Sequence, residues 1–347
     1  MKHLFIISQL LFLYSCCNKP ESTIRIWNYD DFIKKDVKMS DIADEMTIIQ
    51  PDSIDYKGAR IVHASSFFLA GTEQGILKYN NQGHFIGRIG AIGQGPGEYS
   101  RFYAMAINET ERIIYVYRMN TSELLSFSYE GTFLNKHSLQ LPKKWAWSFY
   151  YLRDKFYFYY CVDADNESQP YMYAITDTMG NLLSSKRDES LHFASGSYPS
   201  FPSDHLGIYG DTMLVWSQYS DTIYRVSEKG EEAFAIWGEW DKRLTPAKVE
   251  NDAYEQSMII STIVETVHYY LCIWRPAGIM WNQWNYCFYD KSSGKLFNSE
   301  GITDDLWGLP SIFPYNYYVM DGREYLECGY PSYKLLDAWL TSDDPKI

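Results

Sequence analysis

Short runs of alternating apolar and polar residues, separated by turn residues, recur along most of this chain. The clearest examples occupy residues 61–90 and 103–139. An alternation with a period of two predicts half-buried β-strands, and the Gly, Asn and Ser residues between the runs predict tight turns. Both units enter their last strand through an x-x-Gly-x-Phe step, at Gly83–Phe85 and at Gly131–Phe133. The pattern therefore predicts a repeated strand–turn–strand unit.

Three further units lie at residues 148–187, 206–238 and 266–298. A spacing of roughly 40 to 50 residues is the length expected for one four-stranded propeller blade. A sixth unit can be assembled from both ends of the chain, with inner strands from residues 312–330 and a closing strand from Glu45–Ile49. Such closure hides strand edges that invite aggregation. We predict an all-β fold: a six-bladed β-propeller of four-stranded antiparallel blades, closed by an N-terminal strand.

Composition supports the strand prediction. The chain is 46% hydrophobic and holds 31 tyrosines and 11 tryptophans, which pack well on pleated sheets. The one helical stretch, Ser332–Leu340, places Leu335, Leu336 and Trp339 on one face, and we expect it to form a short C-terminal helix.

The formal net charge of −13 argues against binding to nucleic acid or to an anionic lipid surface, because both need a positive field. Neutral or cationic partners fit better. No cofactor is predicted.

The N-terminus has the features of an export signal. A basic start, Met1–His3, precedes an apolar run from Leu4 to Leu13 that is too short to span a bilayer. The following Leu-x-Ser-Cys sequence resembles a bacterial lipobox, in which Cys16 takes the lipid and becomes the mature N-terminus. We therefore expect a signal peptide at residues 1–15, a lipid-anchored linker at residues 16–23 and the propeller at residues 24–347. An ordinary secretory peptide cleaved nearby is the alternative.

The stretch Gly90–Ser100 contains four glycines and one proline and raises the question of a phosphate-binding loop. A Walker-type loop needs Gly-Lys-Ser/Thr followed by a helix, but Gly97 is followed by Glu98 and then by another strand. The dinucleotide fingerprint also needs a strand-to-helix turn. We therefore predict a connection between two blades, whose tight turns need glycine at positive φ.

This stretch and two later ones resemble a known family. Residues 83–99 resemble the Gly-x-Phe-x-x-x-Ile-Gly-x-x-Gly-x-Gly-Pro-Gly-Glu-Tyr hallmark of the six-bladed β-propeller lipoproteins of Bacteroidetes. Ser220–Val226 is similar to their Asp-Thr-Ile-Tyr-Arg strand, and Tyr289–Lys295 to their Tyr-Asp-Lys-x-x-Gly-Lys hairpin. The resemblance implies a ring related to NHL-type propellers, carried on a lipid anchor at the cell envelope. It implies no catalytic residues, because the family has no established general activity.

Motifs for metal or nucleophilic chemistry are weak in this sequence. His-Glu-x-x-His, Gly-x-Ser-x-Gly and Cys-x-x-Cys are missing. Asp163–Glu167 begins like a calcium loop but has Ser168 at the position that requires glycine, so we interpret it as a hairpin tip and predict no metal site. Cys272 and Cys287 flank one predicted hairpin, where they either face each other across two strands or are buried separately as small apolar residues.

Ligand-binding candidates come from the loops that enter the inner strand of each blade, because such loops surround one mouth of a propeller channel. These loops combine aromatic and polar residues that stack on sugars or hold a peptide; the alternative is that their aromatics pack between blades. The candidates are Glu98, Tyr99, Arg101, Trp147, Tyr198, His205, Glu255, Asp305 and Trp307.

Two functions follow from this reading. The leading hypothesis is a non-catalytic, lipid-anchored propeller outside the cytoplasm, on the outer membrane, that binds a glycan, a peptide or an envelope protein. The rival is a hydrolase or lyase acting on an envelope glycan, with acid and base drawn from channel residues such as Arg101, His205, Glu255 and Asp305. Fold alone does not separate them.

Overall fold

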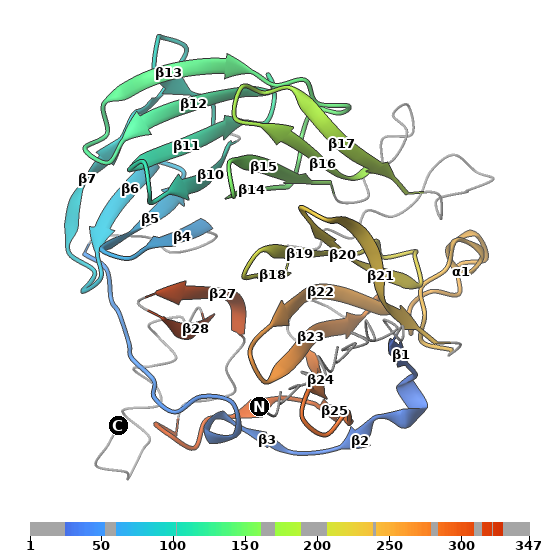
Figure 1. Cartoon of the computed structure of the whole chain (residues 1–347). Helices are drawn as coiled ribbons and strands as arrows, with labels where there is room; N and C mark the ends of the chain where they lie inside the picture. The colour runs from blue at the N-terminus through green and yellow to red at the C-terminus, as the bar shows by residue number, and fades with distance from the viewer. Residues whose placement is uncertain are drawn as a thin grey trace, which may run out of the picture.

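Hairpins between consecutive strands build the chain into blades arranged around a ring (Figure 1). The computed structural model describes residues 25–52, 60–101, 103–160, 171–188, 207–238, 241–278, 284–308, 314–320 and 322–328. Each blade is a meander, because neighbouring strands in a blade are also neighbours in sequence. The prediction of an all-β propeller with four-stranded antiparallel blades is confirmed at this level.

The first three blades have four strands each, in sequence order from the inner to the outer edge. Blade one consists of β4 (Arg60–Ala64), β5 (Phe67–Thr72), β6 (Gly75–Asn80) and β7 (Phe85–Ile89). Blade two consists of β10 (Tyr103–Asn108), β11 (Ile113–Arg118), β12 (Glu123–Ser128) and β13 (Phe133–Ser138). Blade three consists of β14 (Ser148–Leu152), β15 (Lys155–Tyr159), β16 (Tyr171–Asp177) and β17 (Leu182–Arg187).

Blades four and five each gain a fifth strand from the N-terminal segment. Blade four holds β18 (Gly207–Tyr209), β19 (Thr212–Val215), β20 (Thr222–Ser227) and β21 (Gly230–Trp237), with β1 (Arg25–Trp27) parallel to β21. Blade five holds β22 (Met258–Glu265), β23 (Tyr269–Pro276), β24 (Asn285–Asp290) and β25 (Leu296–Ser299), with β2 (Ile33–Lys34) parallel to β25. The N-terminal segment thus covers the outer edges of two blades (Figure 1).

The prediction of six blades is wrong, because the described chain forms five. Residues expected to supply a sixth blade form only a two-stranded sheet, β27 (Pro314–Met320) and β28 (Arg323–Cys328). This hairpin lies between blade five and blade one (Figure 1). The expected closing segment Glu45–Ile49 is not a strand, and Ile48 and Ile49 are exposed.

Short elements complete the described chain. β3 (Val37–Lys38) pairs in parallel with β26 (Ile302–Thr303), and β8 (Ala91–Ile92) with β9 (Glu98–Tyr99). One α-helix occurs in the described residues, α1 (Pro246–Glu250), together with 3-10 turns η1 (Tyr29–Asp31) and η2 (Met39–Asp41). The expected helix Ser332–Leu340 lies outside the described residues.

Aromatic and aliphatic side chains between neighbouring blades form the core. Tyr99 of β9 and Phe127 of blade two pack with Phe67 and Leu69 of blade one, and all four are at most 2% exposed. Trp27 from β1 joins the layer between blades four and five. Cys272 and Cys287 face each other across β23 and β24 as buried free thiols. Because each layer needs two blades, the blades stabilise one another.

A glycine in the outer hairpin of one blade touches the backbone of the segment before it. Gly83, Gly131 and Gly180 all have φ between +87° and +89°. A Cβ on Gly131 would lie 2.5 Å from the carbonyl oxygen of Arg88 in β7, and one on Gly180 would lie 2.6 Å from that of Ser138 in β13. A Cβ on Gly83 would lie 2.8 Å from the carbonyl oxygen of Gln50, in the N-terminal segment. The shared feature of these contacts is thus the glycine at positive φ, and a phenylalanine two residues later follows Gly83 and Gly131 but not Gly180.

The glycine-rich stretch is a blade connection, as predicted. It joins β7 to β10 and doubles back on itself as the β8–β9 pair. The Glu98 carboxylate folds over Gly93 and accepts a hydrogen bond from the Gly95 amide at 2.6 Å. A Cβ on Gly90, where φ is +57°, would lie 2.8 Å from the Phe127 ring. The glycines of this stretch leave space for the Phe127 ring at Gly90 and for the Glu98 carboxylate at Gly93.

Replacing Gly131 with alanine should weaken the junction between blades one and two. We expect Gly131→Ala to lower the free energy of unfolding by about 3 kcal/mol, because strain at positive φ adds to overlap with the Arg88 carbonyl. Gly294→Ala is the matched control: Gly294 also lies in an outer hairpin, at φ +68°, but its nearest neighbour is 3.7 Å away, so it should lose about 1 kcal/mol. Urea unfolding measures the free energy of unfolding of both variants. Equal losses would contradict a role of Gly131 in the contact between blades one and two.

Candidate functional site

The candidate residues of the glycine-rich connection and blade three have structural partners. Tyr99 is 1% exposed; its hydroxyl donates to the Ile89 carbonyl at 2.7 Å and accepts from the Ile76 amide at 2.9 Å. Burial raises its pKa to about 12. Trp147 is half-buried, and its carbonyl accepts a hydrogen bond from Arg60 at 3.0 Å. Arg101 is exposed. Tyr99 is therefore a core residue that joins blades one and two.

The candidates nearer the C-terminus are spread over two loops. Asp305 accepts hydrogen bonds from the Ser40 amide and hydroxyl at 2.9 and 2.6 Å, which lower the pKa of its carboxyl. It thus fastens the N-terminal segment to blade five. Trp307 is half-buried and Glu255 is exposed. Tyr198 and His205 lie outside the described residues. Among the described candidates, only the neighbours Glu98 and Tyr99 are brought together.

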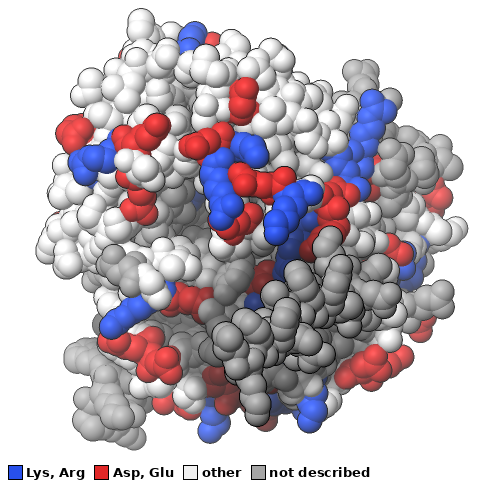
Figure 2. Space-filling view, in the orientation of Figure 1, with Lys and Arg blue, Asp and Glu red and all other residues white. Residues whose placement is uncertain are grey.

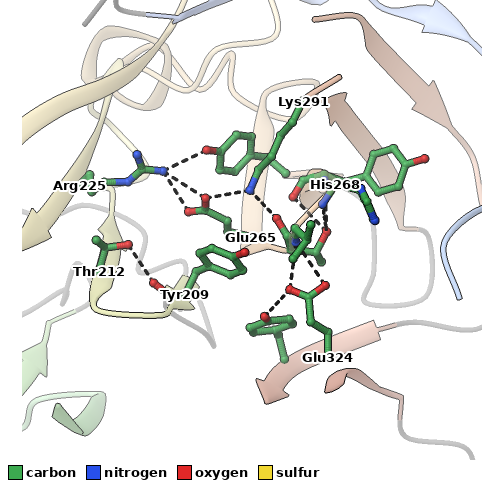
Figure 3. A network of polar contacts seen from close by, with 12 residues as sticks. Tyr209, Thr212, Arg225, Glu265, His268, Lys291 and Glu324 are labelled. Carbon is green, nitrogen blue, oxygen red and sulfur yellow. Dashed lines mark hydrogen bonds and ion pairs between the residues drawn. The ribbon is translucent and has the colours of Figure 1, made fainter. Parts of the chain in front are cut away.

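A polar network gathers at the other end of the inner strands (Figure 3). The candidate loops precede β10, β14, β22 and β27, whereas the network forms where β18 and β22 end, at Tyr209 and Glu265. Arg225 reaches it from β20, Lys291 from the turn after β24 and Glu324 from β28. The network thus joins blade four, blade five and the β27–β28 hairpin.

Glu265 is the centre of the network. Its side chain is 5% exposed, and its carboxylate lies 3.0 Å from the Arg225 guanidinium and 2.9 Å from the Lys291 ammonium. Arg225 also donates to the Tyr270 hydroxyl at 3.0 Å. Burial by itself lowers the pKa of Arg225, but Glu265 and Tyr270 outweigh it and raise that pKa. The carboxylate thus lies between two cations, one from blade four and one from blade five.

A second carboxylate, Glu324, fixes the hairpin to blade five. It accepts hydrogen bonds from the Val267 amide at 3.0 Å and from the Tyr317 hydroxyl at 2.7 Å. On the other side of the hairpin, the His63 ring of β4 stacks on Tyr318 at 3.7 Å, and its Nε2 lies 3.2 Å from Glu327. The hairpin therefore links blade five to blade one.

Two half-buried tyrosines line the network beside these charges. The Tyr209 and Tyr317 rings lie 5.9 Å apart, and the Lys291 ammonium sits 4.7 Å from the Tyr209 ring centroid. Burial raises the pKa of both phenols, with Glu324 adding to the shift, so they stay protonated at neutral pH. Such a surface offers aromatic faces together with hydrogen-bond donors and acceptors.

Charges of both signs gather around the middle of the face drawn in Figure 2. Ion pairs connect blades three and four: Arg153 with Asp211 and Glu228, Lys155 with Glu228, and Lys186 with Glu231. These groups are partly or fully exposed, so each pair contributes little to stability. Together they leave a mixed, locally balanced surface rather than one strong field.

The residues of the network were not among the predicted site residues, although two of them lie in segments that resemble the propeller family. Arg225 is the last residue of the Asp-Thr-Ile-Tyr-Arg segment, and Lys291 belongs to the Tyr-Asp-Lys-x-x-Gly-Lys hairpin. The two segments lie in different blades, yet both cations meet on Glu265. Within the described ranges, no three His, Cys, Asp or Glu side chains group as metal ligands, and no helix there is long and apolar enough to cross a membrane.

Comparison with known proteins identifies the family. The chain belongs to the family described as a domain of unknown function, DUF4934, which matches residues 24–347. No curated protein matches it. Among solved structures, it resembles a Bacteroides fragilis protein named for its expected export, with 15% identity, 91% of each chain covered and a TM-score of 0.61.

Two more distant structures share less of the fold. A DUF4221 family member from Bacteroides vulgatus has 12% identity and a TM-score of 0.47, with 77% of this chain and 86% of that chain covered. AztD from Citrobacter koseri has 9% identity and a TM-score of 0.42, with 73% and 67% covered. The propeller arrangement and the B. fragilis neighbour fit a propeller family of Bacteroidetes.

Removing the central carboxylate charge should destabilise the junction of blades four and five. We expect Glu265→Gln to lower the free energy of unfolding by about 3 kcal/mol, because two largely buried cations lose their counter-charge. Glu228→Gln is the matched control: Glu228 also contacts an Arg and a Lys, but its side chain is 41% exposed, so its loss should stay below about 1 kcal/mol. If chemical denaturation gave the same small change for both, Glu265 would not organise the junction.

Proposed function

We propose that this protein is a lipid-anchored propeller outside the cytoplasm that binds a ligand of the cell envelope at the Glu265 network. The observation that carries the proposal is the pairing of Tyr209 and Tyr317 beside Lys291. Half-buried tyrosines with polar neighbours are well suited to binding because they supply large contact areas and lose little conformational entropy. A glycan or a peptide of an envelope protein fits this surface.

Binding is favoured over hydrolysis by the contacts of the central carboxylate. A general acid or base must come within hydrogen-bond reach of the proton that it transfers. The Glu265 carboxylate is instead buried and engaged by two cations, Arg225 and Lys291. The phenols beside it keep their protons. The charged side chains of the network thus hold one another in fixed positions, which suits ligand recognition more than proton transfer.

The cellular location rests on the N-terminal sequence and on the neighbour. The lipobox-like sequence ends at Cys16, and the family match begins at residue 24, which leaves room for a short linker. Acyl chains on one cysteine anchor a folded domain without a membrane-spanning helix. The B. fragilis neighbour, named for its expected export, supports a location outside the cytoplasm.

A glycan and peptide array, with product analysis of every hit, tests the binding site. The purified protein should bind a hit saturably and return it uncleaved. Tyr209→Ala should weaken binding about fivefold, since one stacked aromatic ring contributes on the order of 1 kcal/mol. Tyr254→Ala, in a loop that precedes an inner strand, is the control and should bind normally. A loss confined to Tyr254→Ala would move the site to the other mouth, and a cleaved product would replace the binding function by catalysis.

Replacing Cys16 should release the protein from the membrane. We expect Cys16→Ala to abolish labelling by a palmitate analogue and to shift the chain out of the lipidated membrane fraction, because the acceptor sulfur is gone. Cys17→Ala is the neighbouring control and should stay labelled. Unchanged labelling of Cys16→Ala would contradict lipidation at this residue.

A further inference from the structure

A polar cavity of about 630 Å³ lies on blade four, away from the Glu265 network. One wall is the η1 turn, which follows β1 at the outer edge of the blade; the other is the loop that leads into α1. Seven residues line it: Tyr29, Asp30, Asp241, Lys242, Arg243, Thr245 and Lys248. Its volume is in the range of small-molecule sites and exceeds what a single inorganic ion needs.

The loop that forms one wall is held in shape by its own lysine. The Lys248 ammonium donates to the carbonyls of Asp241 and Arg243, so the loop wraps around it. The Met258 amide donates to the Lys242 carbonyl at 2.6 Å, and Leu244 is 1% exposed in a small core. These contacts fix the Lys248 side chain and the backbone that carries Lys242 and Arg243 before any ligand arrives, which lowers the entropy lost on binding.

The lining carries more positive than negative charge, although the chain as a whole has a net charge of −13. Three cations, Lys242, Arg243 and Lys248, face two carboxylates, Asp30 and Asp241. Burial lowers the pKa of Lys248; Asp241 opposes this shift, and Arg243 and Lys242 add to it. An anion bound beside these groups would offset their mutual repulsion.

The Arg243 guanidinium is only partly engaged by its neighbours among the described residues. Its Nε is buried and has no hydrogen-bond partner among the described residues, and its ion pair with Asp221 is long, at 3.8 Å. A buried donor without a partner costs free energy that a bound acceptor recovers. The guanidinium is also shaped to hold a carboxylate or a phosphoryl group through two parallel hydrogen bonds.

The remaining lining residues are suited to a sugar ring. Tyr29 provides a half-buried aromatic ring that is held edge-on against Trp274 at 6.0 Å. The two carboxylates accept hydrogen bonds, and Thr245 adds a hydroxyl. Sugar hydroxyls both donate and accept, so this mixed lining matches them, whereas an apolar peptide side chain would leave the charges unsatisfied.

We propose that this cavity binds an acidic saccharide, with its anionic group on Lys242 and Arg243 and its ring beside Tyr29. The site is separate from the Glu265 network, so the inference goes beyond the binding function proposed above. The shared ligand chemistry is a sugar carrying a carboxylate or a phosphoryl group.

Isothermal titration of the purified protein with four probes tests the proposal: glucuronate, glucose 6-phosphate, glucose and inorganic phosphate. Glucuronate, glucose 6-phosphate or both should bind saturably, at least about tenfold more tightly than glucose and inorganic phosphate, and the affinity should fall as salt is raised. Equal binding of inorganic phosphate and of the acidic sugars would overturn the saccharide assignment. Failure of all four probes to bind would overturn the site.

Substitutions test where the acidic sugar binds. Arg243→Gln and Lys242→Gln should each weaken the acidic sugar about tenfold, and the second keeps the test valid if the first fails to fold. Lys229→Gln, in an exposed turn of the same blade, removes the same charge elsewhere and should leave the affinity unchanged. Tyr209→Ala should also leave it unchanged, which separates this site from the Glu265 network. An equal loss in Lys229→Gln would show a general charge effect and contradict the proposal.

Discussion

The close approach of an outer-hairpin glycine to the backbone of the preceding segment is the constraint on which the arrangement of blades one to three depends. Gly131 touches the last strand of blade one, and Gly180 touches the end of blade two. Only a residue without a Cβ fits there at positive φ. The contact sets the spacing of blades one, two and three, whereas the outer-hairpin glycines of blades four and five, Gly230 and Gly294, do not make it. At Gly83 the N-terminal segment takes the position of a preceding blade, so the same contact also helps to close the ring.

Closure in turn positions the polar network. A two-stranded hairpin fills the interval between blades five and one, and it is fixed by Glu324 on one side and by the stacked His63 and Tyr318 on the other. The hairpin delivers Tyr317 to the place where Tyr209 ends the inner strand of blade four. Glu265 of blade five then holds one cation from blade four, Arg225, and one from its own blade, Lys291. The proposed binding surface is thus a product of how three separate parts of the chain meet.

Local features of the fold were predictable from the sequence, and contacts between distant segments were not. Turn glycines such as Gly83 and Gly131 mark hairpins through short-range geometry. The inner strand β22 was missed, because it is buried along its whole length and so lacks alternation. The blade number was wrong because a lone sequence does not show that β1 and β2 pair with strands more than 200 residues away. Arg225 and Lys291 lay in segments recognised as strands and turns, but their shared partner Glu265 lay in the missed strand.

The central claim is that ligand is held where the inner strands β18 and β22 end, against the β27–β28 hairpin. Hydrogen–deuterium exchange of the protein with and without a ligand found on the array tests it most directly. The account predicts slower exchange in residues 207–212, 262–270 and 314–328. Protection confined to the loops around Glu98, Trp147 and Trp307 would contradict it and place the ligand at the opposite mouth of the ring.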